Sequence, residues 1–170
     1  HYSLRKGSYL VDYNLSFVGL EKLIPKNANF VTHSWKQKIS QLELHRDVED
    51  RNTKLHYQYT DGDWDNLSES KDDQESLDFS TRWISFKQQF FNATLINPED
   101  YFEEGNVIST FYEEDEYLKE FQASVQLPYN HQPDQNYDLQ YYFGPNHYQT
   151  LNKLDIGLEN ITSKTGRVVL

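Results

Sequence analysis

The run DGDWD at residues 61–65 carries three carboxylates at alternate positions, a spacing that could bind calcium. The first three ligands of an EF-hand loop stand at these positions. The rest of that loop does not fit, because Asn66 stands where it needs glycine and Asp72 where it needs a bidentate glutamate. The Asp-Gly pair in this run is typical of a β-hairpin. We therefore expect a solvated turn that does not hold calcium specifically.

Histidines are the other side chains here that could bind a metal, but their spacing does not support a site. No two of them stand four residues apart, none belongs to an HExxH pattern, and the chain has no cysteine to complete a zinc site. His33 and His56 fall on expected strands, where a histidine on a polar face or with hydrogen-bond partners is the usual case. The six histidines are His1, His33, His45, His56, His131 and His147.

Motifs for nucleophilic or phosphate chemistry are absent from the sequence. There is no GxSxG elbow and no glycine-rich phosphate loop, and the whole chain has only 7 glycines. Carboxylates are plentiful, but the separation of two carboxylates, which defines a glycosidase pair, is invisible in a sequence. We therefore expect no catalytic residue, no cofactor and no enzyme activity, with a carbohydrate-active site left open as the alternative.

Charge and composition describe a single polar domain. The 170 residues include 27 Asp and Glu against 16 Lys and Arg, so the net charge is -11 and the chain repels nucleic acids and anionic lipid surfaces. Aromatic residues make up 15% of the chain, which favours a folded, strand-rich protein over a disordered one. No apolar run reaches the roughly 18 residues of a membrane span. Since the chain starts at His1 and contains no methionine, we expect a fragment whose targeting and anchoring parts lie elsewhere.

Period-two alternation dominates the chain and predicts an antiparallel β-sandwich. Residues 9–17 are the clearest case, with Tyr9, Val11, Tyr13, Leu15 and Phe17 on one face. About eight strands are expected in all, joined by polar turns. Residues 41–52 are expected to form a short exposed helix or a long polar turn, and residues 68–75 a solvated loop. The other expected strands cover residues 30–38 (with Trp35 inward), 53–59, 83–86, 90–96, 106–112, 121–127 and 139–143.

The end of the chain changes character at Gly144 and Pro145. A strand precedes this pair, and the spacing of Tyr148, Leu151 and Leu154 after it predicts a helix over residues 145–155 with those side chains buried. Pro145 is expected in the first turn of the helix, and a glycine at position 157 is expected to end it. Asn146, Gln149 and Asn152 are expected to face water or a partner.

Three stretches of this sequence resemble the periplasmic domain of the YidC membrane protein insertases. RWISFKQQFF at residues 82–91, with Trp83, Phe90 and Phe91, is similar to an aromatic signature of that domain. YFGPNHY at residues 142–148, followed by Leu151, resembles the segment that leads into its closing helix. LDIGLE at residues 154–159 resembles the piece before the next membrane span, and GSYLVDY at residues 7–13 is a weaker match to its first strand.

The resemblance implies a mainly β fold, a supersandwich of the galactose-mutarotase-like kind with a C-terminal α-helix packed on it. Residues 1–170 would be a single periplasmic domain fragment, with the β-sandwich in residues 1–143. Residues 144–160 would hold the C-terminal helix and the lead-in to a membrane span. The domain would lie on the periplasmic side of the cell inner membrane, between the first and second spans of the insertase.

The function implied by the resemblance is help in inserting and folding membrane proteins, alone or with the Sec translocon. The domain would be a structural or interaction appendage, and its partners would be Sec accessory subunits, nascent membrane proteins and the rest of the same polypeptide in the membrane. The insertase groove is not in this chain, so the resemblance implies no catalytic or groove residue. The residues implied in interaction or structure are Trp83, Phe90, Phe91, Gly144, Pro145, Tyr148, Leu151 and Leu154.

Two departures from the family pattern affect the ends of the chain. Residues 160–170 are too polar and short for the apolar span that follows in the family, and family members have further strands before the region that matches Tyr2. An exposed strand edge near the start is therefore expected. The closing helix could aim the domain at the membrane or simply cover an open sheet edge.

Two other functions remain open at this stage. A carbohydrate-binding or carbohydrate-active module would need exposed aromatic residues around a groove with convergent carboxylates. A plain adhesion module would have no helix pointing away from the sheet and no neighbouring membrane spans in the full-length protein.

Overall fold

A computed structural model describes residues 1–113 and 116–162 of the chain as a two-layered β-sandwich. Two α-helices and two short 3₁₀-helices join or follow the strands: η1 (Leu20–Lys22), α1 (Arg46–Asn52), α2 (Tyr148–Asn152) and η2 (Leu158–Ile161). The strands are β1 (Tyr2–Leu4), β2 (Leu10–Val18), β3 (Phe30–Ser40), β4 (Lys54–Tyr59), β5 (Trp64–Asn66), β6 (Asp73–Leu77), β7 (Thr81–Lys87), β8 (Phe91–Ile96), β9 (Gly105–Phe111), β10 (Tyr117–Pro128) and β11 (Asp134–Pro145).

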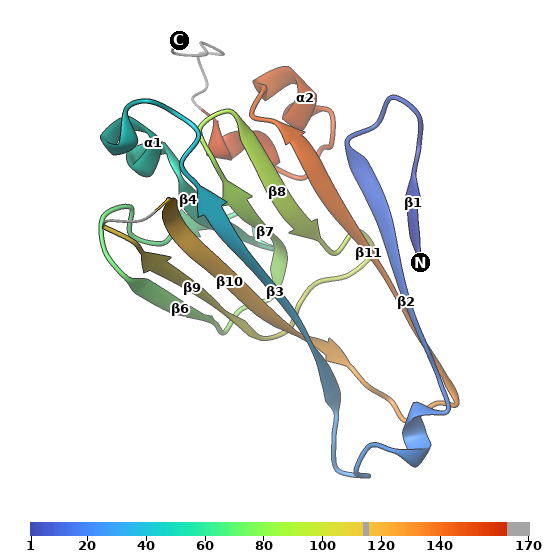
Figure 1. The fold of residues 1–170 in the computed structure, drawn as a ribbon. Helices are drawn as coiled ribbons and strands as arrows, with labels where there is room; N and C mark the ends of the chain where they lie inside the picture. The colour runs from blue at the N-terminus through green and yellow to red at the C-terminus, as the bar shows by residue number, and fades with distance from the viewer. Residues whose placement is uncertain (114–115, 163–170) are drawn as a thin grey trace.

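The strands form a larger and a smaller antiparallel sheet. The 7-stranded sheet has the order β1-β2-β11-β8-β7-β4-β5, and the 4-stranded sheet has the order β3-β10-β9-β6. Figure 1 shows the two sheets facing each other, with α1 and α2 at the same end of the sandwich. The predicted mainly β, antiparallel sandwich with a C-terminal helix is confirmed.

The main core lies between the two sheets and follows from the alternation in the strands. In β10, Phe121, Ala123 and Val125 are buried at every second position. Trp35 of β3 points inward as predicted, and its ring stacks on that of Phe86 at a centroid distance of 3.8 Å.

A second cluster, here called the outer cluster, lies on the other face of the larger sheet, beneath α2 and η2. It explains why β7 and β8 are buried on both faces, since one face packs into the main core and the other against the C-terminal segment. The outer cluster consists of Trp83, Ile96, Tyr142, Leu151, Leu158 and Ile161.

Short edge strands account for most of the difference from the sequence prediction. β1 and β6 were not expected, whereas β5 pairs with β4 as the second strand of the hairpin that Asp61 and Gly62 indicated. β6 lies partly within residues 68–75, where a solvated loop was predicted. Its residues Asp73, Gln74 and Glu75 pair with β9 at the edge of the smaller sheet, where charged side chains remain in water. β1 is exposed at the edge of the larger sheet, so a strand edge near the start of the chain is exposed as expected.

Tyr9 does not share the face of Val11, as the alternation predicted. It precedes β2, and its ring lies 6.0 Å from that of Tyr142, on the side of the outer cluster. Val11, Tyr13 and Leu15 do pack against the main core. The period of two holds only from Leu10 onward, where pairing with β11 fixes the backbone.

The helix α1 is less exposed than the sequence predicted for residues 41–52. Glu49 and Asp50 are buried. The Glu49 carboxylate accepts hydrogen bonds from the backbone N–H groups of Leu42 and Glu43 at 3.0 to 3.1 Å, which compensates its loss of water.

The C-terminal helix is shorter than predicted, and Pro145 is not part of it. Pro145 is the last residue of β11 and pairs with Phe91 of β8. β2 begins only at Leu10, which pairs with Tyr142. Beyond Tyr142, the side of β11 on which Pro145 lacks an N–H therefore has no paired strand. Gly157, with a φ of 75°, precedes η2 and does not end α2.

Among the described residues, no helix is long and apolar enough to cross a membrane. Most of the polar tail at residues 160–170 lies outside the described residues, as does part of the acidic stretch at residues 113–120.

Candidate functional site

The helix α2 is held on the larger sheet mainly through one of its side chains. Leu151 is fully buried in the outer cluster, and Leu154, just after the helix, is half buried against it. Tyr148 is also half buried, but it faces a neighbouring pocket. A helix of this length is not stable alone, so packing against the sheet maintains it.

Trp83 connects the sheet to this segment by hydrogen bonds as well as by packing. Its indole N–H is within 2.7 Å of the Gln58 side-chain oxygen and 2.9 Å of the Ile156 carbonyl oxygen. Gln58 is itself buried and donates to the carbonyl oxygen of Gly62. This one indole therefore links β7, β4 and the segment after α2.

Gly144 allows the close approach of two aromatic rings at the end of β11. A Cβ atom at this position would lie 2.6 Å from the phenol end of Tyr142 and 2.8 Å from Cγ of Tyr9. The Tyr142 hydroxyl donates to the carbonyl oxygen of Pro145 at 2.9 Å. The Gly-Pro pair therefore fixes the end of β11 against the outer cluster.

Asn146 does not face water, as its place in the predicted helix suggested. Its side-chain amide donates to the carbonyl oxygens of Gln88 and Gln89, and its side-chain oxygen accepts from Asn92 at 2.8 Å. These bonds hold the chain after β11 on the turn between β7 and β8. Gln149 and Asn152 are exposed, as expected.

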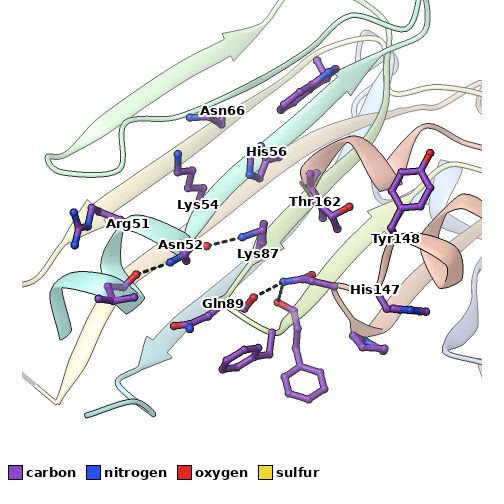
Figure 2. Close-up of a pocket in the computed structure, with 17 residues that line it drawn as sticks. Arg51, Asn52, Lys54, His56, Asn66, Lys87, Gln89, His147, Tyr148 and Thr162 are labelled. Carbon is purple, nitrogen blue, oxygen red and sulfur yellow. Dashed lines mark hydrogen bonds between the residues drawn. The ribbon is translucent and has the colours of Figure 1, made fainter. Parts of the chain in front are cut away.

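A pocket of about 670 Å³ lies beside this turn, on the outer face of the larger sheet. Phe90 and Phe91 line it, and Phe91 is 57% exposed. Tyr148 and Trp64 line it as well. Figure 2 shows α1 and strand residues on one side of the space and the residues around α2 on the other. Two of the aromatic residues singled out from the sequence, Phe90 and Phe91, therefore lie at a cavity instead of in the core.

Positive charge gathers at this pocket. Lys54 of β4 and Lys87 of β7 are direct cross-strand partners and both line it, as does Arg51 of α1. None of the 17 described lining residues is Asp or Glu. Glu69, which is not among the lining residues, forms an ion pair with Lys54, with its Oε2 atom 2.5 Å from the Lys54 Nζ atom. Lys87 donates a hydrogen bond to the carbonyl oxygen of Asn52 at 2.8 Å.

Lys54, His56 and Lys87 form the floor of the pocket, and burial and neighbouring charges lower the pKa values of Lys87 and His56. Burial, and then Lys54, lower the pKa of Lys87 to about 8. His56 is only 5% exposed, and burial, followed by the charges of Lys87 and Lys54, lowers its pKa to about 3. Its Nδ1 atom is buried without a hydrogen-bond partner among the described residues. Of the two usual cases expected for a strand histidine, His56 therefore fits the polar face, since it lines the pocket, and His33 has a hydrogen-bond partner in the Tyr141 hydroxyl at 2.9 Å.

Asp61 and Asp63 lie in the turn between β4 and β5, and Asp65 lies in β5 itself. Asp61 accepts a hydrogen bond from the backbone N–H of Asp63 at 3.0 Å, which is typical of an Asx turn. Within residues 1–113 and 116–162, no group of three or more His, Asp or Glu side chains could hold a metal ion. That the turn does not hold calcium specifically remains a prediction.

The sequence analysis missed the basic side chains of the pocket. Leu55 and Tyr57 of β4 face the main core, so alternation places Lys54 and His56 on the other face of the same strand. This placement could have been predicted from the sequence. The pairing of Lys54 with Lys87 depends on a strand register that the sequence does not specify.

Comparison with known proteins identifies the family. A family described as the YidC periplasmic domain matches residues 1–162. A relative in Bacteroides fragilis is 37% identical over 159 residues, covering 93% of this chain and 26% of the relative. One in Phocaeicola vulgatus is 34% identical, covering 92% of this chain and 25% of the relative. One in Parabacteroides distasonis is 33% identical with the same coverage, 92% and 25%.

All three relatives are named membrane protein insertase YidC, and the chain spans about a quarter of their length. The match covers both the sandwich and the packed C-terminal segment. The chain therefore belongs to the family of YidC periplasmic domains.

Proposed function

We propose that this chain acts as the periplasmic domain of a membrane protein insertase, on the outer side of the inner membrane. Membership of the YidC periplasmic domain family and the names of the relatives support this role. The rest of the insertase, including its membrane core, would belong to the same polypeptide.

The domain would serve as a structural and interaction appendage without enzyme activity. The observation that carries this role is the fixed C-terminal segment, which the outer cluster and the Trp83 hydrogen bonds join to β7, β8 and β11. A sandwich joined in this way keeps a constant orientation relative to whatever its C-terminal segment contacts. Nascent membrane proteins and accessory subunits of the Sec translocon are the partners we propose.

The carbohydrate alternative loses its support. It required convergent carboxylates beside exposed aromatic residues, and the aromatic-lined pocket has basic side chains instead. The named relatives are insertases. Mutarotation of glucose or galactose above the buffer rate, abolished by one carboxylate substitution, would contradict a non-enzymatic role.

Labelling of the full-length protein tests the proposed location. The chain has no cysteine, so Asp61→Cys in the exposed β4–β5 turn introduces a single reporter into this domain. A membrane-impermeant maleimide should label it in spheroplasts without lysis. The same protein should restore growth and membrane protein insertion in cells depleted of their own insertase. Labelling only after lysis, or no restored insertion by an accumulated protein, would overturn the proposal.

A further inference from the structure

The floor of the pocket brings like charges together at an energetic cost. Lys54 and Lys87 stand directly opposite each other on β4 and β7, and like charges in such cross-strand positions destabilise a sheet. Arg51 adds a third cation at the end of α1. In a chain with a net charge of -11, this local excess of positive charge is the reverse of the overall balance.

Only one of these three cations has an ion-pair partner within 4.0 Å among the described residues. Lys54 has Glu69 as its ion-pair partner. Arg51 and Lys87 have hydrogen bonds to the backbone oxygens of Asp47 and Asn52, but no ion pair with any described residue. Two cations without an ion-pair partner match the charge of about -1.5 to -2 that a phosphate monoester carries at neutral pH.

A buried polar atom on the same floor also lacks a partner. Nδ1 of His56 is enclosed and unbonded, although buried nitrogen atoms in proteins nearly always have a hydrogen-bond partner. His56 stands two residues from Lys54 on the same face of β4, and Figure 2 shows it close to Lys54 and Lys87. The Nδ1 atom itself is out of reach of a ligand, so His56 adds a polar side chain to this part of the pocket while the lysines beside it supply the charge.

The walls of the pocket have a different chemistry from its floor. Trp64 is 43% exposed, Phe91 is more than half exposed, and Tyr148 is half buried at the far side. Aromatic surface of this kind gains free energy when an apolar group covers it. The volume of about 670 Å³ is in the range of ordinary small-molecule sites.

We propose that this pocket binds an amphiphilic phosphate monoester. The phosphate lies over Lys87 and Arg51, and the apolar part of the ligand covers Trp64 and Phe91. Two sources share this chemistry, the head group of a phosphatidic-acid-type lipid and a soluble phosphate monoester with an apolar substituent. The overall negative charge of the domain opposes binding to anionic surfaces in general, so binding depends on this pocket.

Calorimetric titration of the 170-residue chain with hexyl phosphate tests the pocket directly. Inorganic phosphate and hexanol serve as the matched probes for the charge and for the apolar part. Hexyl phosphate should bind at least about tenfold more tightly than either probe, because only it contacts both the floor and the walls. Equal affinity for hexyl phosphate and inorganic phosphate, or no binding of hexyl phosphate at millimolar concentration, would overturn the proposal.

Substitutions separate the pocket from general electrostatic attraction. Lys87→Met and Arg51→Gln should each weaken hexyl phosphate binding by about tenfold, whereas Lys36→Gln should change it by less than about twofold. Lys36 is a fitting control because it lies on the other sheet and its loss changes the net charge equally. Lys87→Met also removes the hydrogen bond from Lys87 to the end of α1, whereas Arg51→Gln leaves that bond in place. An equal effect of all three substitutions would contradict a specific site.

Vesicles distinguish the two sources of the ligand. Sedimentation with phosphatidylcholine vesicles containing phosphatidic acid, lost in Arg51→Gln, supports a lipid head group. Hexyl phosphate binding without vesicle association supports a soluble monoester. Vesicle association that both Arg51→Gln and Lys87→Met leave unchanged would contradict binding through this pocket.

Discussion

The indole N–H of Trp83 lies 2.9 Å from the carbonyl oxygen of Ile156, so the centre of the larger sheet is bonded directly to the segment that follows α2. The same N–H approaches the side-chain oxygen of Gln58 at 2.7 Å. Trp83 is fully buried, and water therefore cannot replace either bond. The connection between sheet and C-terminal segment depends on this residue more than on any backbone pairing of the segment.

Replacing Trp83 with phenylalanine should therefore destabilise the protein. The oxygens of Gln58, which is buried, and of Ile156, which is partly buried, would lose their donor at a cost of about 1–3 kcal/mol, and the smaller ring would leave a void. Trp64→Phe is the matched control and should cost about 0.5 kcal/mol or less, because Trp64 is exposed. Urea unfolding measures both, and equal losses would contradict the role assigned to Trp83.

Leu151→Ala should separate the packed side of α2 from its exposed side. Truncating a fully buried leucine costs about 2–5 kcal/mol, whereas Gln149→Ala on the exposed side should cost about 0.5 kcal/mol or less. Thermal or urea unfolding checks the difference. An unchanged stability in Leu151→Ala would show that the packing of α2 on the sheet is wrong.

Gly144→Ala should destabilise the end of β11. The added methyl group would lie 2.6 Å from the phenol end of Tyr142, a distance that real Cβ atoms do not tolerate. Overpacking of this kind costs about 1–3 kcal/mol. Asn152→Ala, at an exposed position near the end of α2, provides the baseline for an alanine substitution in this region. A cost no greater than that of the baseline would mean that the rings of Tyr142 and Tyr9 move aside freely.

The fold was largely predictable because the face of each main strand that the alternation of side chains marks as apolar is the face that packs in the core. Residues 121–127 alternate apolar and polar side chains, and this pattern alone predicts one buried face. The C-terminal helix was predicted too long, because spacing cannot show that β8 continues to pair with β11 as far as Pro145. Short edge strands such as β6 carry charged residues, and their sequence does not distinguish them from loops.

The candidate site was less predictable than the fold. Leu151 follows from helical spacing, and its burial agrees with that prediction. Phe90 and Phe91 were expected from the resemblance, but only the structure shows that they border a pocket. The two facing lysines, Lys54 and Lys87, come from segments about thirty residues apart and meet only through the strand register.

Acid should destabilise the protein through His56. Its folded pKa of about 3 lies below the ordinary value of 6.5, so the unfolded state binds the proton first as the pH falls. Stability contributed by neutral His56 is therefore complete above pH 6.5 and is lost progressively toward pH 3. Between pH 7 and pH 5 the loss amounts to about 2 kcal/mol.

Unfolding free energies of the wild type and His56→Gln across this pH range check the prediction. The variant should lose about 2 kcal/mol less, because its side chain does not titrate. His33, whose pKa burial also lowers, remains in both proteins and cancels in the comparison. Parallel curves for the two proteins would contradict the buried, neutral state of His56.

The central claim is that the domain contributes a fixed C-terminal segment to the insertase. It is tested by measuring membrane protein insertion with two full-length variants of matched stability. Leu151→Ala loosens that segment, and Leu127→Ala removes an equally buried leucine from β10 in the other sheet. At equal protein levels and equal unfolding free energy, Leu151→Ala should reduce insertion clearly more than Leu127→Ala. Equal loss of insertion in both variants would contradict the claim and reduce α2 to a cover for the sheet.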